Sequence, residues 1–421
     1  MNPFGKEQLA EKSFTHELFS GLRNNVPSSR FSLTDLATAT NVDIDDSGRP
    51  LRRLGFGNAV QSGSWHSLSP PGPRCFGVTG TNLVEVMPNY STKVLATVTP
   101  NAPVEYFYSA ARIYWSNGYE KGCIEGAVNR SWGLDVPPSI SGTVTAGTLM
   151  IGKTDLVTTR YQFVMTYLRN DGQESGAGTA NYLDVPNNGG IAFSNLPVSS
   201  DSTVDKKAIY ISEPNGETMY RAIVLNNAQT SATYRNRGRM TLPLATQFLE
   251  PPPPGTIISL QGGSMLVAVG NKLYYSEPFA FELFDRRKNK LFASPITIVC
   301  SFDNGSHVAT EDLHVWLAGD TPDKWEWNAR ASYGAIPRTL DFIDLDAALF
   351  GKTENVNPVG LWATKEGIVQ ATAEGALINL TRARFMYPIQ ETGATVVRGA
   401  RGMHQYIVTL KGAETPAPSF S

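Results

Sequence analysis

The sequence predicts an all-β fold, in which a β-propeller-like series of hairpins is interrupted by an inserted β-sandwich. Three observations support this. The 421 residues include 38 glycines and 27 prolines, which favour short strands and turns over long helices. Hairpins of similar apolar pattern recur every few tens of residues. Proline runs at residues 137–138 and 251–254 bracket an interval with a different pattern, and such runs form stiff, extended hinges.

The two ends of the chain are predicted to be extensions that dock on neighbours. Residues 6–22 have the pattern of a short amphipathic helix within an N-terminal arm of residues 1–29. Residues 24–27, Asn-Asn-Val-Pro, end that helix because proline and asparagine favour turns. Residues 414–421 form a C-terminal tail.

The propeller is predicted in two parts, residues 30–137 and residues 255–413. Each hairpin joins a short apolar strand, through a turn containing Gly or Asn, to a strand rich in aromatic or β-branched residues. The clearest hairpins are residues 75–86, 105–118, 265–276, 299–319 and 361–380. About five to seven blades are compatible with this repeat. A large mixed β-sandwich is the alternative.

The interval 138–254 is predicted to be a separate sandwich domain, since it has roughly the 100 residues that such domains need. Tyr161, Phe163, Met165 and Tyr167 alternate with other residues, as in a strand with one buried face. Expected strands are residues 161–167, 177–185, 190–196, 207–213 and 218–224. The pattern from residue 161 through the Asn-Asp-Gly turn to Glu-Ser at 174–175 resembles strand C and the following turn of fibronectin type III-like domains.

Composition argues against a nucleic-acid-binding surface and favours protein contacts. Lys and Arg number 36 against 38 Asp and Glu, a net charge of −2, so no basic surface is indicated. Charged residues make up 18%, below the roughly one quarter usual in soluble proteins. With many aromatic residues, this balance fits a chain that buries surface against copies of itself or other proteins. A polar all-β protein without such contacts is the alternative.

The cysteines and the apolar segments indicate where the chain is assembled. Cys75, Cys123 and Cys300 are widely spaced and odd in number, which predicts reduced thiols and assembly in a cytosol. The N-terminus lacks the apolar core of a signal peptide, and no segment reaches the roughly 18 apolar residues of a membrane span.

The motifs of nucleophilic catalysis and cofactor binding are missing from the sequence, so we expect no enzyme activity and no cofactor. A Gly-x-Ser-x-Gly elbow, a phosphate-binding glycine loop and a zinc ligand set are all absent. His307 and His314 are seven residues apart and are interpreted as surface or strand-end histidines.

One acidic loop has part of a calcium-binding pattern. Asp43, Asp45 and Ser47 occupy the first, third and fifth positions of such a loop, with Gly48 at the sixth. The twelfth position is Leu54, which cannot supply a bidentate carboxylate. A hairpin turn that uses Asp and Gly for its geometry is the alternative.

Two further groups suggest carbohydrate chemistry. Asp341, Asp344 and Asp346 would suit a glycosidase, although no acid partner aligns with them and the segment also reads as the polar face of a strand or loop. Trp325 and Trp327 would suit a sugar-stacking platform, although core packing explains most tryptophans.

A short basic run at residues 286–290 is a candidate contact with DNA phosphates, with a solvated loop or a partner-docking patch as the alternative. We expect this run and the acidic loop to face partners or a channel. The candidate contact residues are therefore Asp43, Asp45, Arg286, Arg287, Lys288 and Lys290.

Short motifs in both halves of the chain, taken in order, resemble the nozzle or hub proteins of short-tailed bacteriophages. In the first half they are residues 23–30, 41–55 and 63–68. In the second half they are residues 273–278, 316–322, 361–367, 380–382 and 393–398. The resemblance covers most of residues 20–410, and the fibronectin-like segment falls where that family tolerates an insertion. Each motif is short, so their shared order carries the resemblance.

The resemblance implies a structural virion protein of the phage tail, assembled in the host cytoplasm. Six copies would form a ring around the DNA ejection channel, below the portal-adaptor complex. Partners would include the portal-adaptor proteins and tail fibres or a tail needle or plug. Double-stranded DNA would pass through without sequence-specific binding. A near-neutral chain suits such a conduit, because many basic contacts would hold the genome.

Two other functions remain open at this point. The chain fits a carbohydrate-binding or glycan-cleaving tail adhesin built on a β-propeller, although the long β-helical repeats of many tailspikes are missing. It also fits a stopper or hub protein of a long-tailed phage.

Overall fold

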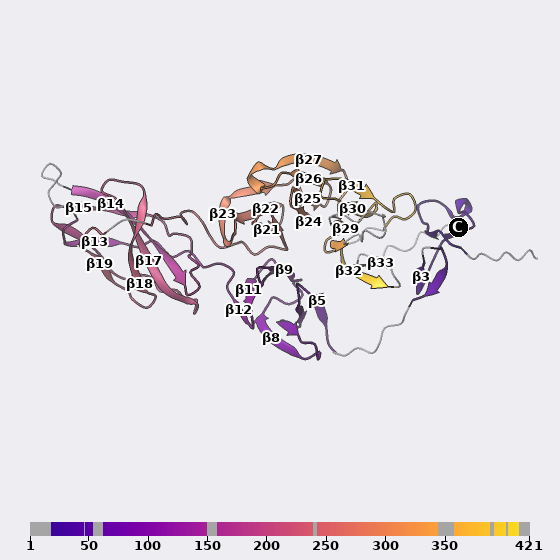
Figure 1. Ribbon diagram of the computed structural model, residues 1–421, viewed down its shortest axis with the longest axis horizontal. Coiled ribbons are helices and arrows are strands. Elements are labelled where there is room, and N and C mark those ends of the chain that lie inside the picture. Colours follow the sequence, from indigo (N-terminus) through magenta and orange to yellow (C-terminus); the bar gives the residue numbers. More distant parts are fainter. Residues whose placement is uncertain are drawn as a thin grey trace, which may run out of the picture. The chain divides into compact units, whose positions relative to one another are not determined.

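The computed structural model describes residues 18–45, 47–53, 62–149, 158–238, 242–343, 358–387, 391–400 and 403–411. Within these ranges the chain is built of β-strands and two short 3-10 turns, η1 (Ser28–Arg30) and η2 (Pro322–Lys324) (Figure 1). The predicted all-β class is therefore confirmed.

The chain divides into two compact units. One unit contains Met1–Val60, Ala335–Thr372 and Ala376–Ser421. The other contains Gln61–Gly334 with Ala373–Gly375.

Outside the sandwich described below, the described part of the larger unit contains four antiparallel sheets of four strands each, and in each of these sheets the strands pair in sequence order. The first sheet consists of β5 (Trp65–Ser69), β6 (Cys75–Thr79), β7 (Asn82–Val86) and β8 (Thr92–Thr97). The second consists of β9 (Glu105–Ser109), β10 (Arg112–Ser116), β11 (Lys121–Glu125) and β12 (Val128–Arg130). The third consists of β20 (Ile257–Gln261), β21 (Ser264–Val269), β22 (Lys272–Glu277) and β23 (Ala280–Leu291). The fourth consists of β24 (Ile296–Phe302), β25 (Gly305–Thr310), β26 (His314–Ala318) and β27 (Glu326–Ala331).

The first strands of successive sheets lie next to one another. The backbone N–H of Val104, just before β9, donates to Ser67 Oγ in β5 at 2.8 Å. β20 contacts both β9 and β24. The hydroxyls of Ser259 on β20 and Ser301 on β24 form a hydrogen bond at 2.8 Å. A series of meander sheets joined at their first strands is the connectivity of propeller blades.

Successive sheets also pack face to face. Along β21, Met265 and Val267 join a core cluster shared with the second sheet, whereas Leu266 and Ala268 join a cluster shared with the fourth sheet. All four side chains are fully buried. Because alternate side chains of a strand point to opposite faces, a strand between two packed sheets must be apolar at every position. Burial of a side chain such as Leu266 stabilises the fold by about 1.5–3 kcal/mol.

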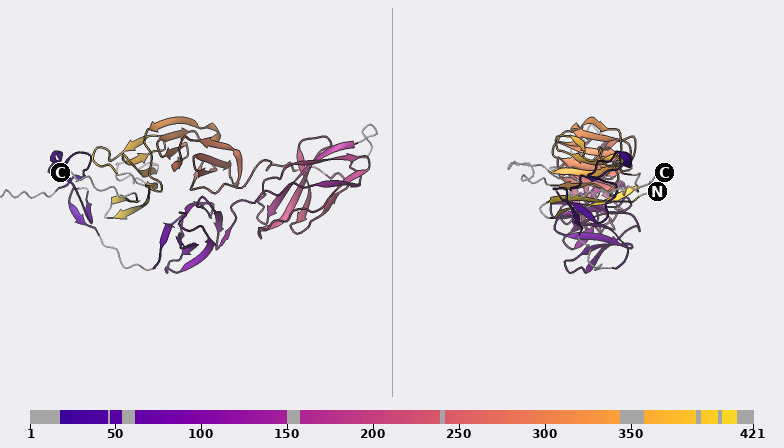
Figure 2. Two further views of the ribbon diagram at one scale, coloured as in Figure 1. Left: turned by 180° about the vertical axis from the view of Figure 1, so that it is seen from behind. Right: turned by 90° about the vertical axis from the view of Figure 1, so that its right-hand side faces the viewer.

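The sandwich is formed by residues 142–234, between the second and third sheets in sequence and inside the predicted interval 138–254. One sheet has the order β13 (Gly142–Ala146), β16 (Gly189–Phe193), β19 (Ala232–Tyr234). The other has the order β15 (Asn181–Pro186), β14 (Thr158–Arg169), β17 (Val204–Ser212), β18 (Met219–Asn226). The two sheets face each other (Figure 2). The five strands expected here are confirmed, while β13 and β19 were not predicted.

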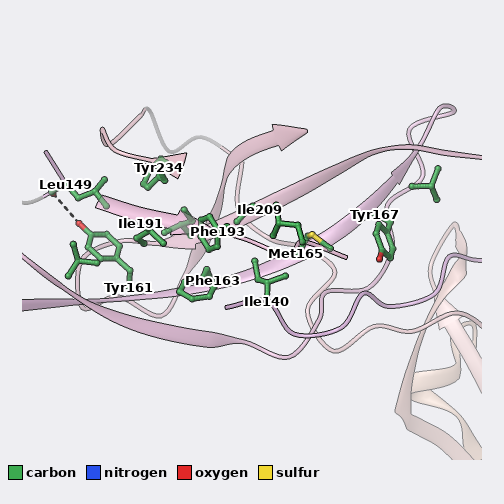
Figure 3. Close-up of a cluster of buried hydrophobic side chains, with 14 of the residues drawn as sticks. Ile140, Leu149, Tyr161, Phe163, Met165, Tyr167, Ile191, Phe193, Ile209 and Tyr234 are labelled. Atoms are coloured by element: carbon green, nitrogen blue, oxygen red, sulfur yellow. Dashed lines mark hydrogen bonds between the residues drawn. The ribbon is translucent and has the colours of Figure 1, made fainter. Parts of the chain in front are cut away.

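Alternate side chains of β14 form the centre of the sandwich core (Figure 3). Phe163 meets Phe193 of the opposite sheet edge-on, with ring centroids 5.1 Å apart. The prediction of a single buried face on this strand is wrong, however. Val164 and Thr166 on the other face are also buried, because Ala177 and its neighbours cover that face.

The described part of the smaller unit contains one further four-stranded sheet and three two-stranded sheets. The sheet consists of β28 (Asp341–Ile343), β29 (Val359–Thr364), β30 (Gly367–Ala371) and β31 (Leu377–Asn379), in sequence order. The hairpin of β32 (Thr392–Ala400) and β33 (Met403–Lys411) packs on it. The remaining strands are β1 (Gly21–Leu22), β2 (Asp35–Leu36), β3 (Val42–Ile44) and β4 (Pro50–Arg52).

The end of the helix predicted for residues 6–22 is wrong. Gly21 has a φ of 106°, which a helix excludes, and β1 pairs in parallel with β2. Asn24 and Asn25 then donate side-chain hydrogen bonds to the backbone carbonyls of Met386 and Ala383, so contacts rather than helical propensity decide this segment. Residues 1–17 of the predicted arm and the tail 414–421 lie outside the described residues.

Candidate functional site

The predicted basic run lies in strand β23, so the alternative that it forms a loop is wrong, although its side chains are in part exposed. The register of the β22–β23 pairing shifts at two places, so β23 contains β-bulges at which the strand bends. Three of its cations are paired with carboxylates. Arg286 pairs with Glu250 at 3.3 Å, Arg287 with Asp285 at 2.7 Å and Lys288 with Glu277 at 2.9 Å. Most of the positive charge that phosphates would need is therefore balanced locally.

Arg287 remains the most accessible of these cations, with 70% of its side chain exposed. Its guanidinium lies 5.0 Å from the ring centroid of Phe248. Phe248 is 62% exposed and has a φ of 65°. A left-handed backbone is costly for a bulky residue, and such strain is concentrated at functional positions.

The acidic loop forms the turn of the β3–β4 hairpin. The Asp43 carboxylate forms ion pairs with Arg53 Nη2 at 2.9 Å and with Arg398 Nη2 at 3.0 Å. Two guanidiniums therefore already balance its charge. Asp45 Oδ1 accepts hydrogen bonds from the backbone N–H groups of Ser47 and Arg49 and so fixes the turn. Asp45 thus has the role that the hairpin-turn alternative to a calcium loop assigns to it. Across the described ranges, no group of three or more acidic, His or Cys side chains is placed to hold a metal ion. Asp46 and Leu54 lie outside them.

The two central histidines are buried, so the predicted surface position is wrong for both, whereas His314 begins β26 and is the strand-end residue that the sequence allowed. His307 and His314 lie on the paired strands β25 and β26, and each is 1% exposed. His307 packs against Trp316 with ring centroids 4.5 Å apart and ring planes tilted by 42°. Burial lowers the pKa of His314 to about 4, and its Nδ1 lies 2.6 Å from the carbonyl oxygen of Tyr333.

The two candidate sugar-binding tryptophans do not form a platform. Trp325 is 9% exposed and donates from Nε1 to Gln261 Oε1 at 2.9 Å, so core packing is confirmed for it. Trp327 is 48% exposed and packs on Phe292. Asp341 Oδ2 accepts the backbone N–H of Val397, and burial raises the pKa of Asp341. Asp344 and Asp346 lie outside the described residues.

The cysteines are not paired with one another. Cys123 and Cys300 are buried, and Cys75 is half-buried. Burial raises the pKa of Cys123 to about 11, although nearby arginines oppose this shift. The reduced thiols that the sequence predicts are compatible with these positions.

Sequence reasoning missed a charged network between the sandwich and the neighbouring sheets. Arg112 contacts Glu125 and Glu282, each at 3.3 Å. Arg130 contacts Glu125 at 2.7 Å and Asp171 at 2.8 Å. These partners are up to 170 residues apart, so no local spacing indicated them. The only signal was the Asn-Asp-Gly turn that contains Asp171.

A small cavity of about 290 Å³ lies beside this network. Its lining includes Arg112, Glu174, Glu282 and Phe279. Phe279 is 84% exposed and has a φ of 58°, the same strained conformation as Phe248. Phe248 and Phe279 therefore share an exposed side chain and a backbone conformation that is costly for a bulky residue.

No helix in the described part of the chain is long and apolar enough to cross a membrane.

Comparisons with known proteins assign no family to the chain. No protein-family model matches it, and no curated protein matches it. A streptogramin B lyase structure is 10% identical, with a TM-score of 0.33 over 85% of this chain and 96% of the other. The AfRom2 CNH domain is 8% identical, with a TM-score of 0.25 over 82% of this chain and 93% of the other. An extracellular domain of a one-component system from B. thetaiotaomicron is 10% identical, with a TM-score of 0.21 over 84% of this chain and 52% of the other. Similarity this low assigns neither fold family nor function.

Proposed function

We propose that this chain is a structural subunit of the tail nozzle of a short-tailed bacteriophage. In this proposal six copies form a ring around the DNA ejection channel, below the portal-adaptor complex, in a virion tail assembled in the host cytoplasm. The subunit contains a β-propeller with an inserted fibronectin type III-like sandwich. It contributes assembly geometry rather than catalysis and needs no cofactor.

The observation that carries the proposal is the order of the elements. Four-stranded meander sheets, joined at their first strands, are interrupted by a seven-stranded sandwich at residues 142–234. The ordered motifs that resemble nozzle proteins lie on either side of this insertion. The connectivity of the sheets supports the propeller, and the position of the sandwich supports its interpretation as an insertion.

The surface gives independent support for a role in assembly. Phe248 and Phe279 are exposed and strained, which suits side chains that are covered when a neighbouring protein binds. The basic residues of β23 are balanced by carboxylates, which suits a channel through which DNA must slide without being held. The partners we propose are further copies of this chain, the portal-adaptor proteins, and tail fibres or a needle or plug.

A variant of the basic run tests the contact with the portal-adaptor complex. Arg287→Ala combined with Lys290→Ala removes two cations from β23, and we expect binding of the purified ring to that complex to weaken about tenfold. Lys206→Ala, which removes an exposed cation from the sandwich, is the matched control and should bind normally. Unchanged binding by the double variant would show that this strand does not contact the complex.

The adhesin alternative loses its main structural feature, because Trp325 is buried and only Trp327 is accessible. No observation on the described residues favours it over the nozzle.

A further inference from the structure

The charged network connects the sandwich to the second sheet and the second sheet to the third, so it restricts the movement of the sandwich. We propose that the sandwich is locked to the neighbouring sheets by an ionic joint centred on Asp171, and is therefore a rigid arm rather than a domain on a flexible tether. This inference concerns the fold and does not depend on the proposed function.

The β14–β15 turn presents the Asp171 carboxylate in a fixed orientation. Asp171 Oδ1 accepts the backbone N–H of Gln173 at 3.0 Å, which holds the side chain across its own turn. Gly172 has a φ of 90°, so the tight turn needs the freedom of glycine at this position. Oδ2 is left to accept Arg130 Nη1 at 2.8 Å and lies 3.6 Å from Arg112 Nη2. The turn therefore delivers one carboxylate oxygen to two guanidiniums of the second sheet.

The guanidiniums are themselves held by carboxylates from other elements. Arg112 lies on β10 and Arg130 on β12, and Glu125, at the end of β11, contacts both. Glu282, on β23 of the third sheet, contacts Arg112. The side chain of Arg130 is only 10% exposed. A network in which Arg112, Arg130 and Asp171 each have at least two charged partners is stronger than an isolated exposed pair, which contributes about 0–1 kcal/mol.

A second side chain of the sandwich reaches the same region. The Arg169 side chain is 1% exposed, and its Nε donates to Thr203 Oγ1 at 2.8 Å. Its Nη2 contacts Asp201 at 3.4 Å and donates to the backbone carbonyl oxygen of Ser131 at 3.2 Å. Ser131 follows β12 directly. Arg169 therefore binds the backbone just beyond the second sheet through Ser131, and it binds the sandwich through Thr203 and Asp201.

The returning proline segment is clamped as well. Lys121 Nζ donates to the carbonyl oxygen of Pro252, and Arg286 Nη2 donates to that of Pro251 at 3.1 Å. A Cβ on Gly133 would lie 2.8 Å from Pro251 Cβ and 2.9 Å from the carbonyl oxygen of Glu282, so the backbones meet closely here. Proline runs are semi-rigid spacers on their own. Side chains therefore hold both segments that connect the sandwich to the sheets, the one after β12 and the proline run before β20. We infer that the sandwich does not move freely.

Paired spin labels test the joint in the full chain. Labels on Lys206→Cys in the sandwich and Thr92→Cys in the first sheet report the distance between them by double electron-electron resonance, with Cys75→Ser in the background. We expect a narrow distance distribution for this parent and at least a twofold broader one for Asp171→Asn. Asp184→Asn, which breaks the exposed pair with Arg160 elsewhere in the sandwich, is the matched control and should keep the narrow distribution.

Each outcome decides the proposal. A broad distribution in the parent overturns the rigid arm, and equal widths for D171N and D184N overturn the role of Asp171. If D171N does not fold, Asp171→Glu, which keeps the charge but lengthens the side chain, replaces it. A D171E distribution as narrow as that of D184N would then also count against a joint with this geometry.

Discussion

Glu174 offers the sharpest test of the structural account, because one carboxylate organises three side chains of the sandwich. Its Oε1 accepts the hydroxyls of Thr166 at 2.6 Å and Tyr210 at 2.8 Å. Its Oε2 accepts Arg221 Nη2 at 2.9 Å. Thr166 is fully buried and Tyr210 is 1% exposed, so neither hydroxyl can turn to bulk water. Replacement by alanine removes both acceptor oxygens, and with them all three hydrogen bonds.

The magnitude follows from the groups that lose their acceptor. A buried hydroxyl without an acceptor costs about 1–3 kcal/mol, and Glu174→Ala leaves two such hydroxyls. Arg221 is 28% exposed and also donates to Tyr210, so its loss is smaller. Some relaxation and water entry will reduce the sum. We therefore expect E174A to lower the free energy of unfolding of the sandwich by about 2–4 kcal/mol.

Urea denaturation of the full chain, followed by hydrogen exchange at β14 and β17, measures this loss in the sandwich itself. Glu213→Ala is the matched control, because Glu213 forms an exposed pair with Arg237 and its removal should cost less than about 0.5 kcal/mol. A change of less than about 0.5 kcal/mol for E174A as well would refute the hydrogen-bonding account.

Three further outcomes are expected. Burial lowers the pKa of His314 in the folded chain to about 4, against an ordinary value near 6.5. Its contribution to the free energy of unfolding is therefore complete above pH 6.5 and falls by roughly 3 kcal/mol towards pH 4. Urea titrations at pH 7 and pH 4.5 should show a smaller loss of stability for His314→Phe than for the parent chain. Gly176→Ala would place a Cβ 1.7 Å from the Leu249 carbonyl oxygen and should cost more than about 3 kcal/mol in thermal unfolding, whereas Gly238→Ala, in open space, should be nearly neutral. Trp325→Phe, which loses the hydrogen bond to Gln261, should destabilise by about 1–2 kcal/mol, and an equal effect of Trp327→Phe would contradict the assigned burial.

Local pattern was sufficient to predict five strands of the sandwich and the clearest hairpins, but not β1, β13 or β19. The alternation of Tyr161, Phe163, Met165 and Tyr167 predicted β14, and the Asn-Asp-Gly turn predicted its end. The hairpin at residues 265–276 was predicted because its apolar residues flank a Gly-Asn turn. These features depend on neighbours in sequence, and their physical cause is the period of the strand and the conformational freedom of the turn residues.

Long-range packing was what the sequence did not disclose. The burial of His307 and His314 depends on strands and loops packed around them, and the residues themselves are common at surfaces. A loop was one alternative for the basic run, whereas the structure places these residues in β23, where the pairing with β22 is bulged. Asp171 and Arg130 meet only because the sandwich folds back on the second sheet. The apolar spacing of the segment that contains Gly21 indicates a helix, but the positive φ of Gly21 excludes a helical backbone at this position.

The central claim is that copies of this chain form a ring in a phage tail, and the symmetry of the purified particle tests it most directly. Electron microscopy of the protein, alone and mixed with portal-adaptor complex, would show the symmetry and the stacking. The nozzle proposal predicts a six-fold ring with an open centre that stacks beneath the portal-adaptor complex. A stable monomer that joins no tail component but binds a polysaccharide would contradict it.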